Sequence, residues 1–193
     1  MPIQLSNFVD QFADALKRVD ERELQHRTYQ PGIGPHTESK TIDLIVDELA
    51  EVDPEIYGSA DEETFPSSRK RCDLVIPGHW AVELKLARPF GDNGSESQHW
   101  MKNLLYPYAG NTSVIGDCMK LQNSDFSERE AVVVFGYEHM PPKISLEVAV
   151  EALEVIAEEV CQIELGPRFE AKVQNLVHPV HQQARVYGWE VLT

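Results

Sequence analysis

The stretch Arg71-Cys-Asp-Leu-Val-Ile-Pro-Gly-His-Trp-Ala-Val-Glu-Leu-Lys85 decides the fold of the middle of the chain. Two apolar runs, residues 74–76 and 80–82, flank a short break at Pro77-Gly78-His79. Apolar strands that are joined by a three-residue loop containing Gly are typical of a β-hairpin. The sequence therefore predicts a hairpin whose turn is centred on Gly78.

The register of this hairpin brings charged side chains to one face. A turn centred on Gly78 pairs residues whose numbers sum to 156, so Asp73 is expected opposite Glu83. Directly opposed side chains have Cβ atoms about 4.5–5.5 Å apart. Strand alternation places Lys85 on the same face as Glu83. Because like charges placed side by side destabilise a sheet, the pair indicates a function, and a divalent metal site is the commonest one.

A solvated strand face is the simpler interpretation of Glu83-Leu84-Lys85, because acids and lysines often alternate along exposed strands. The flanking positions are strongly apolar, however, and this favours a central, buried strand over an edge strand. Charges on a buried strand need partners or a metal. The context of the motif therefore favours the functional interpretation.

Length and composition bound the class of protein. With 193 residues, of which 42% are hydrophobic and 25% charged, the chain can form one domain with a sizeable core. It has no apolar run near the roughly 20 residues that span a bilayer, and its N-terminus lacks the features of a signal peptide. We therefore expect a single cytoplasmic domain over residues 1–193 that has no membrane partner. Three widely spaced cysteines, Cys72, Cys118 and Cys161, favour reduced thiols over disulfides.

The charge balance limits the partners. The chain has 32 acidic and 17 basic residues and a net charge of −15. This speaks against non-specific coating of nucleic acid, because neutralisation of phosphates supplies that affinity. A nuclease is compatible with the charge, since a local basic patch on an acidic body suffices. Arg69, Lys70 and Arg71 form such a patch directly before Asp73, although a solvated loop end explains the triplet equally well.

Apolar spacing and turn formers divide the rest of the chain. Helical spacing predicts an amphipathic N-terminal helix over about 5–24 with Ser6 as its N-cap, and Thr37 is expected to cap a second helix. The expected elements are, in order, these two helices with an irregular loop over 29–36 between them, a strand over 55–59, an acidic connection over 61–63, the hairpin, helices over 95–106 and 112–121, a buried strand over 131–137, a helix over 145–163 with a solvated acidic face, and strands over 168–177 and 183–192. This order indicates an α/β or α+β domain with a mixed sheet.

Asp73, followed after nine residues by Glu83-Leu84-Lys85, resembles the motif of the PD-(D/E)xK nuclease superfamily, which contains many restriction and repair endonucleases. The expected element order is similar too, from the helix that carries Glu38 to the strand that ends near Tyr137, about half of the chain. Cys72 stands where many members of the superfamily have proline. The resemblance implies a restriction-endonuclease-like mixed sheet flanked by helices, with the N-terminal helix and the C-terminal strands as additions.

The resemblance also implies roles for particular residues. Asp73 and Glu83 would hold Mg²⁺ or Mn²⁺ together with the carbonyl of Leu84, and Lys85 would orient or help to deprotonate the attacking water. Glu38 would supply the further acid that many members place on a helix, and its alternative role is that of an ordinary first-turn acid. Gln98 matches a glutamine that some members place beside the active site.

Other candidate residues are weaker. Lys102 is a candidate contact for backbone phosphate, whereas Arg88, Asn93 and His99 fit loop or surface positions better. His178 and His181 lie three residues apart, but Pro179 between them and the lack of a nearby cysteine argue against zinc. The chain has no P-loop and no Gly-x-Ser-x-Gly motif.

The leading functional expectation is a metal-dependent endonuclease that hydrolyses phosphodiesters in DNA and leaves 5′-phosphate and 3′-hydroxyl ends. A role in restriction or defence, and a homodimer that cuts both strands, follow by family analogy alone. Two alternatives remain open: a nuclease that acts on RNA, and a nuclease-like module that no longer cleaves but binds a partner. The net charge of −15 favours the second of these, and the intact acids and lysine oppose it.

Overall fold

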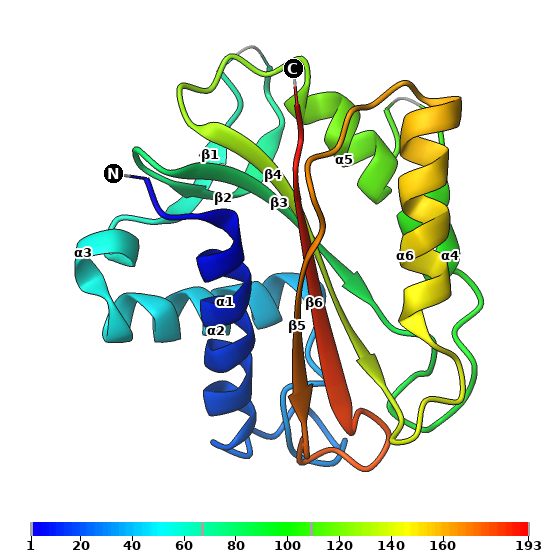
Figure 1. Cartoon of the computed structure of the whole chain (residues 1–193). Coiled ribbons are helices and arrows are strands. Elements are labelled where there is room, and N and C mark those ends of the chain that lie inside the picture. The colour runs from blue at the N-terminus through cyan, green and yellow to red at the C-terminus, as the bar shows by residue number, and fades with distance from the viewer. Residues whose placement is uncertain (1, 67, 109, 193) are drawn as a thin grey trace.

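The computed structural model describes residues 2–66, 68–108 and 110–192, and within them six strands form one sheet with helices on both faces (Figure 1). The order across the sheet is β1-β2-β3-β4-β6-β5. The strands are β1 (Asp61–Thr64), β2 (Arg71–Ile76), β3 (Trp80–Ala87), β4 (Arg129–Glu138), β5 (Phe169–Gln174) and β6 (Gln183–Glu190). The helices are α1 (Leu5–Asp20), α2 (Glu38–Val52), α3 (Pro54–Tyr57), α4 (Trp100–Leu105), α5 (Val114–Leu121) and α6 (Leu146–Val155), which continues as a π-helical turn η1 (Ile156–Val160).

The sheet is mixed, as the element order predicted. Strands β3 and β4 are parallel, and α4 and α5 lie in the connection between them. The pairs β1–β2, β2–β3, β4–β6 and β5–β6 are antiparallel. The prediction of a mixed α/β fold with a helix-flanked sheet is therefore confirmed.

The predicted hairpin and its register are confirmed in the part that pairs. Leu74 lies opposite Val82, and the next two pairs towards the turn follow the same sum of 156. Gly78 has a φ of +73°, a left-handed conformation that glycine adopts without steric cost. The apolar runs and one glycine thus fix how β2 and β3 meet.

Two apolar layers enclose the sheet. Helices α1 and α2 cover one face, and α4, α5 and α6 cover the other (Figure 1). On β3, Val82 and Leu84 belong to the core under α1 and α2, whereas Ala81 and Ala87 belong to the core under α4 to α6. Because side chains alternate along a strand, Glu83 and Lys85 lie on the side of α4 to α6.

Helix starts follow the predicted caps in one case and not in the other. The Thr37 side chain accepts a hydrogen bond from the Lys40 backbone N–H, as expected for the cap of α2. The prediction of Ser6 as the cap of α1 is wrong, because Gln4 is the N-cap and makes no side-chain cap bond. Helix α1 also ends at Asp20, four residues before the predicted end.

Three local predictions between residues 53 and 106 are wrong. The segment predicted as a strand over 55–59 is helix α3, which begins at Pro54 and is capped by the Asp53 side chain. The acidic connection is edge strand β1, whose four residues are all exposed, so it lacks the apolar alternation of a buried strand. Helix α4 begins only at Trp100, because the backbone of 95–97 pairs with that of 89–91.

The C-terminal third supports the end of the sheet beyond β4. The predicted strands appear as β5 and β6, but the acidic face of α6 is not simply solvated. Glu147 pairs with Arg168 at 2.8 Å and with Arg185 at 3.2 Å, and Glu154 accepts a hydrogen bond from the Trp189 indole at 2.9 Å. These contacts join α6 to β6. Among the described residues, no helix is long and apolar enough to cross a bilayer.

Candidate active site at the edge of strand β3

Two carboxylates cover the edge of β3 where its pairing with β2 has ended. Asp73 Oδ2 accepts a hydrogen bond from the Leu84 backbone N–H at 2.8 Å, and Glu38 Oε2 accepts one from the Leu86 N–H at 2.7 Å. Since the N–H and C=O of one residue point to the same neighbouring strand, the Leu84 carbonyl also points to this edge. The structure thus brings Glu38, Asp73 and Leu84 together from α2, β2 and β3.

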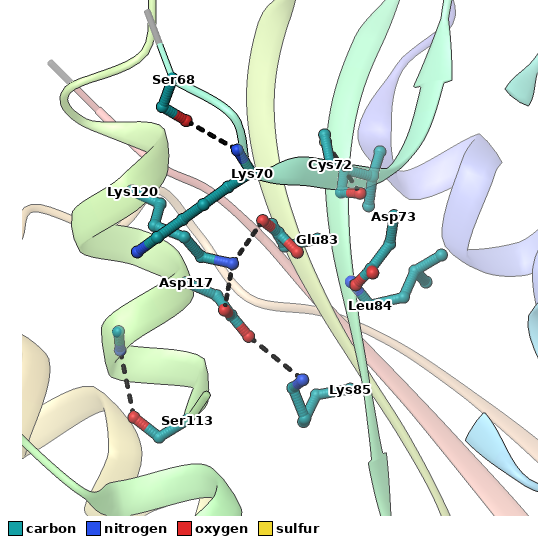
Figure 2. A network of polar contacts seen from close by, with 12 residues as sticks. Ser68, Lys70, Cys72, Asp73, Glu83, Leu84, Lys85, Ser113, Asp117 and Lys120 are labelled. Atoms are coloured by element: carbon teal, nitrogen blue, oxygen red, sulfur yellow. Dashed lines mark hydrogen bonds and ion pairs between the residues drawn. The ribbon is translucent and has the colours of Figure 1, made fainter. Parts of the chain in front are cut away.

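Asp73 and Glu83 do not form the directly opposed pair that the register predicted. The paired part of the hairpin ends at Leu74 and Val82. Beyond it, the Asp73 carboxylate turns to the Leu84 N–H, whereas the Glu83 carboxylate turns to the Lys120 ammonium at 2.8 Å (Figure 2).

An irregularity in β2 explains this difference. The register between β1 and β2 shifts within this region, between Asp61 and Glu63. Cys72 packs in the same core layer as Val75, three residues away, so strict alternation is broken between them. Asp73 lies inside the irregular segment and leaves the position that a regular strand would give it.

A chain of ion pairs links the motif to helix α5 (Figure 2). Lys85 Nζ lies 3.4 Å from Glu38 Oε1 and 3.3 Å from Asp117 Oδ2. Lys120 Nζ lies 2.7 Å from Asp117 Oδ1 and 2.8 Å from Glu83 Oε1. Asp117 therefore divides its two carboxylate oxygens between two lysines, and each lysine also contacts one acid predicted for the site.

Sequence reasoning missed Asp117 and Lys120. Both lie on α5, at positions i and i+3, and the Asp117 side chain is buried among the apolar residues of that helix. An acid in the middle of the apolar run Val114-Ile-Gly-Asp-Cys118 is the signal that could have identified the first of them, since a buried charge needs a partner. Nothing in the spacing shows that this partner includes Lys85.

The electrostatics of the cluster reflect burial and an excess of acids. Burial raises the pKa of Glu83 to about 9, and the charges of Asp117 and Asp73 add to the effect. Burial also raises the pKa of Glu38. Burial lowers the pKa of Lys85, but the surrounding carboxylates, Asp117 first among them, outweigh it and raise that pKa above its ordinary value. Lys85 is consequently a protonated cation at neutral pH.

The remaining predicted site residues lie outside this cluster. Gln98 is exposed in a turn before α4, and, within the described part of the chain, it makes no hydrogen bond to the site residues. Lys102 is also exposed and lies over the Tyr106 ring, 5.2 Å from its centroid. Arg69 and Lys70 are exposed, and Arg71 pairs with Glu62 at 3.0 Å. The helix predicted to begin at residue 95 begins only after Gln98, and the roles predicted for these residues stay predictions.

The histidines near the C-terminus serve the packing of loops. His178 and His181 stack with centroids 4.7 Å apart, and His181 Nε2 lies 3.1 Å from Asp92. The Gly34 backbone approaches His181 so closely that a Cβ at residue 34 would lie 2.5 Å from the ring. Within the described residues, neither histidine forms a hydrogen bond or ion pair with the acids and lysines of the cluster described above.

The cluster as it stands is held together by N–H groups and ammonium groups. Across residues 2–66, 68–108 and 110–192, no three or more His, Cys, Asp or Glu side chains are grouped closely enough to hold a metal ion. All four carboxylates are engaged with lysines or backbone N–H groups. Comparisons of the chain with protein-family models, curated proteins and solved structures give no match.

Proposed function

We propose that the chain is a metal-dependent endonuclease of the PD-(D/E)xK type that hydrolyses phosphodiester bonds in DNA. One observation carries the proposal. Glu38, Glu83 and Asp117 are linked by ion pairs through the two ammonium groups of Lys85 and Lys120, and Asp73 lies at the same end of β3 on the Leu84 N–H. The ionised cluster has an excess of two negative charges, which equals the charge of one divalent cation.

The donor chemistry suits Mg²⁺ or Mn²⁺. Asp73, Glu83 and Glu38, with the Leu84 carbonyl, would hold the ion through oxygen atoms, which hard divalent cations prefer. Burial and the charges of Asp117 and Asp73 raise the pKa of Glu83 although the Lys120 ammonium lies 2.8 Å away, so a divalent cation held there would stabilise the ionised carboxylate. The chemistry supplied by such an ion when bound would be Lewis-acid stabilisation of charge on the phosphoryl oxygens.

Lys85 would act as a fixed cation. Glu38 and Asp117 hold its ammonium from two sides, at 3.4 and 3.3 Å, and its raised pKa keeps the proton on nitrogen at neutral pH. A protonated lysine can donate hydrogen bonds to the attacking water or to a phosphoryl oxygen, and it offsets the negative charge that develops there. This favours the orienting role of Lys85 over deprotonation of the water.

The arrangement of elements supports a restriction-endonuclease-like interpretation of the fold. The acid-bearing helix α2, the β2–β3 hairpin, the helical connection and the parallel strand β4 follow the order that the motif implied. Helix α1 and strands β5 and β6 would then be additions to this core. DNA as the substrate and a homodimer that cuts both strands belong to the same proposal.

A cleavage assay tests the proposal. The purified chain is incubated with plasmid DNA, linear single-stranded DNA and RNA, with Mg²⁺, Mn²⁺ or EDTA. We expect metal-dependent cleavage of DNA that is lost in EDTA and in Lys85→Ala, while Lys172→Ala, which changes an exposed lysine on β5, cuts normally. Cleavage that survives Lys85→Ala unchanged, or that persists in EDTA, would refute the mechanism. Cleavage of RNA but not of DNA would show that RNA is the substrate.

A second candidate is a non-cleaving binding module, and one observation favours it. A hollow of about 520 Å³ between α2 and β1 leads to Asp73 and is lined by five acids and one lysine. Its charged residues are Lys40, Asp43, Asp47, Asp61, Glu62 and Asp73. Such a surface attracts basic proteins and repels phosphates. Absence of cleavage, combined with no rise in thermal stability on addition of Mg²⁺ or Mn²⁺, would favour this candidate.

A further inference from the structure

A small pocket next to the candidate active site is lined by two lysines and by no acidic residue. It has a volume of about 160 Å³ and is lined by Phe65, Ser68, Lys70, Lys120 and Asn123. Two of these five residues are lysines and none is an acid, although the chain has 32 acids and a net charge of −15. A pocket of this size is smaller than the cavities that take drug-sized ligands. It suits a small anion.

Lys70 supplies a cation without a carboxylate partner. Its side chain is exposed, and among the described residues no acid lies within ion-pair distance of it. The Ser68 hydroxyl oxygen accepts a hydrogen bond from the Lys70 backbone N–H at 3.1 Å, which leaves the hydroxyl hydrogen free to donate. An anion in the pocket would therefore meet an ammonium and a hydroxyl donor from the segment before β2.

Lys120 connects the pocket to the active site. Its Nζ contacts Glu83 and Asp117, and it lies 5.9 Å from the centroid of the Phe65 ring in the wall of the pocket (Figure 2 shows Lys70 and Lys120 beside α5). The same ammonium can face Glu83 or an anion in the pocket. A group bound there would lie beside the cluster that contains the proposed metal ligands.

We infer that this pocket binds a phosphate group of the nucleic-acid strand next to the phosphate that is cleaved. The inference rests on the proposed function, because it places the strand along Lys70 and Lys120 towards Glu83. It also answers how a chain with net charge −15 can hold a polyanion: the strand would use this basic pocket and avoid the acidic hollow between α2 and β1.

Binding without cleavage tests the inference. A fluorescein-labelled single-stranded DNA 12-mer is titrated with the protein in EDTA at several salt concentrations, and anisotropy is measured. Lys70→Gln is compared with Lys172→Gln, which removes the same charge from an exposed lysine on β5. Inorganic phosphate is added as a competitor in a separate series.

We expect Lys70→Gln to raise the Kd for the 12-mer about three- to fivefold, as for the loss of one exposed charge contact. The slope of log Kd against log salt concentration should fall by about one, the value for one phosphate contact. Lys172→Gln should bind as the unchanged chain does, and phosphate should compete with the 12-mer for the unchanged chain but not for Lys70→Gln. Equal affinities of the two variants would overturn the inference, as would phosphate binding with no binding of the 12-mer. This binding assay does not depend on cleavage, because EDTA removes the divalent metal. A chain that binds the 12-mer through Lys70 but shows no activity in the cleavage assay would therefore count against the proposed function and not against the phosphate pocket.

Discussion

Asp117 is the residue whose replacement should reveal most about the cluster. The change Asp117→Asn keeps the size of the side chain and removes the charge that faces both lysines. The side chain is only 2% exposed, and its two ion pairs measure 2.7 Å to Lys120 and 3.3 Å to Lys85. Loss of one partner of a buried ion pair costs about 3–5 kcal/mol when the other charge is left alone.

Here each lysine retains a second acid, so the full cost should not appear. Lys120 keeps Glu83 and Lys85 keeps Glu38, and the repulsion between Asp117 and Glu83 is relieved. We therefore expect a loss of about 2 kcal/mol in the free energy of unfolding, which corresponds to a fall of roughly 4–8 °C in Tm for a chain of this length.

Urea unfolding followed by circular dichroism at pH 7 measures this loss. The matched control is Asp10→Asn, which removes the same charge from an exposed position on α1 and should change the stability by less than about 0.5 kcal/mol. A stability of Asp117→Asn equal to that of the control, or above that of the unchanged chain, would refute the view that Asp117 holds the two lysines. A stability above that of the unchanged chain would make Asp117 a net source of repulsion.

Three further predictions concern groups outside the cluster. Burial lowers the pKa of His181 to about 4, so mainly the unfolded chain takes up this proton between pH 6.5 and 4. This proton should lower the stability by roughly 1.5 kcal/mol as the pH drops from 6.5 to 5, and urea titrations should show a steeper slope in the unchanged chain than in His181→Gln, which keeps the lowered pKa of His178. Asp20 is fully buried and accepts hydrogen bonds from two backbone N–H groups, so Asp20→Ala should cost about 2–4 kcal/mol in the same assay, against little change for the exposed Asp14→Ala on the same helix. A thiol reagent should modify Cys161 first, because it is half-buried while the other two cysteines are fully buried. Reaction of all three thiols at one rate without denaturant would contradict the burial of Cys72 and Cys118.

Local sequence signals were sufficient where one segment interacts with its neighbour in the chain. The apolar runs around Gly78 gave the hairpin and its register, and Thr37 gave the start of α2. These features depend on residues a few positions apart, so periodicity and turn chemistry specify them. The same signals misled for β1, because an edge strand with exposed charged side chains has the composition of a loop.

The positions of the side chains in the Asp73–Lys85 motif were only partly predictable from the sequence. The sequence placed Glu83 and Lys85 on one side of β3, and the structure agrees. It also placed Asp73 opposite Glu83, but an irregularity in β2 turns the Asp73 carboxylate to the Leu84 N–H. Such an irregularity depends on the pairing of β2 with β1, which no pattern within the hairpin contains.

The sequence by itself thus determined that Asp73, Glu83 and Lys85 would gather on one hairpin, because strand alternation is a property of the backbone. Only the tertiary structure decided which groups pair with these charged side chains. Glu38 reaches Lys85 across 47 positions in the chain, and α5 brings Asp117 and Lys120 from more than thirty positions away. The position of α5 is set by the crossover between the parallel strands β3 and β4. Where β3 is no longer paired with β2, its backbone N–H groups donate hydrogen bonds to the carboxylates of Asp73 and Glu38. Ion pairs between distant segments depend on how helices and strands pack against one another, and the spacing of residues within one segment does not specify that packing.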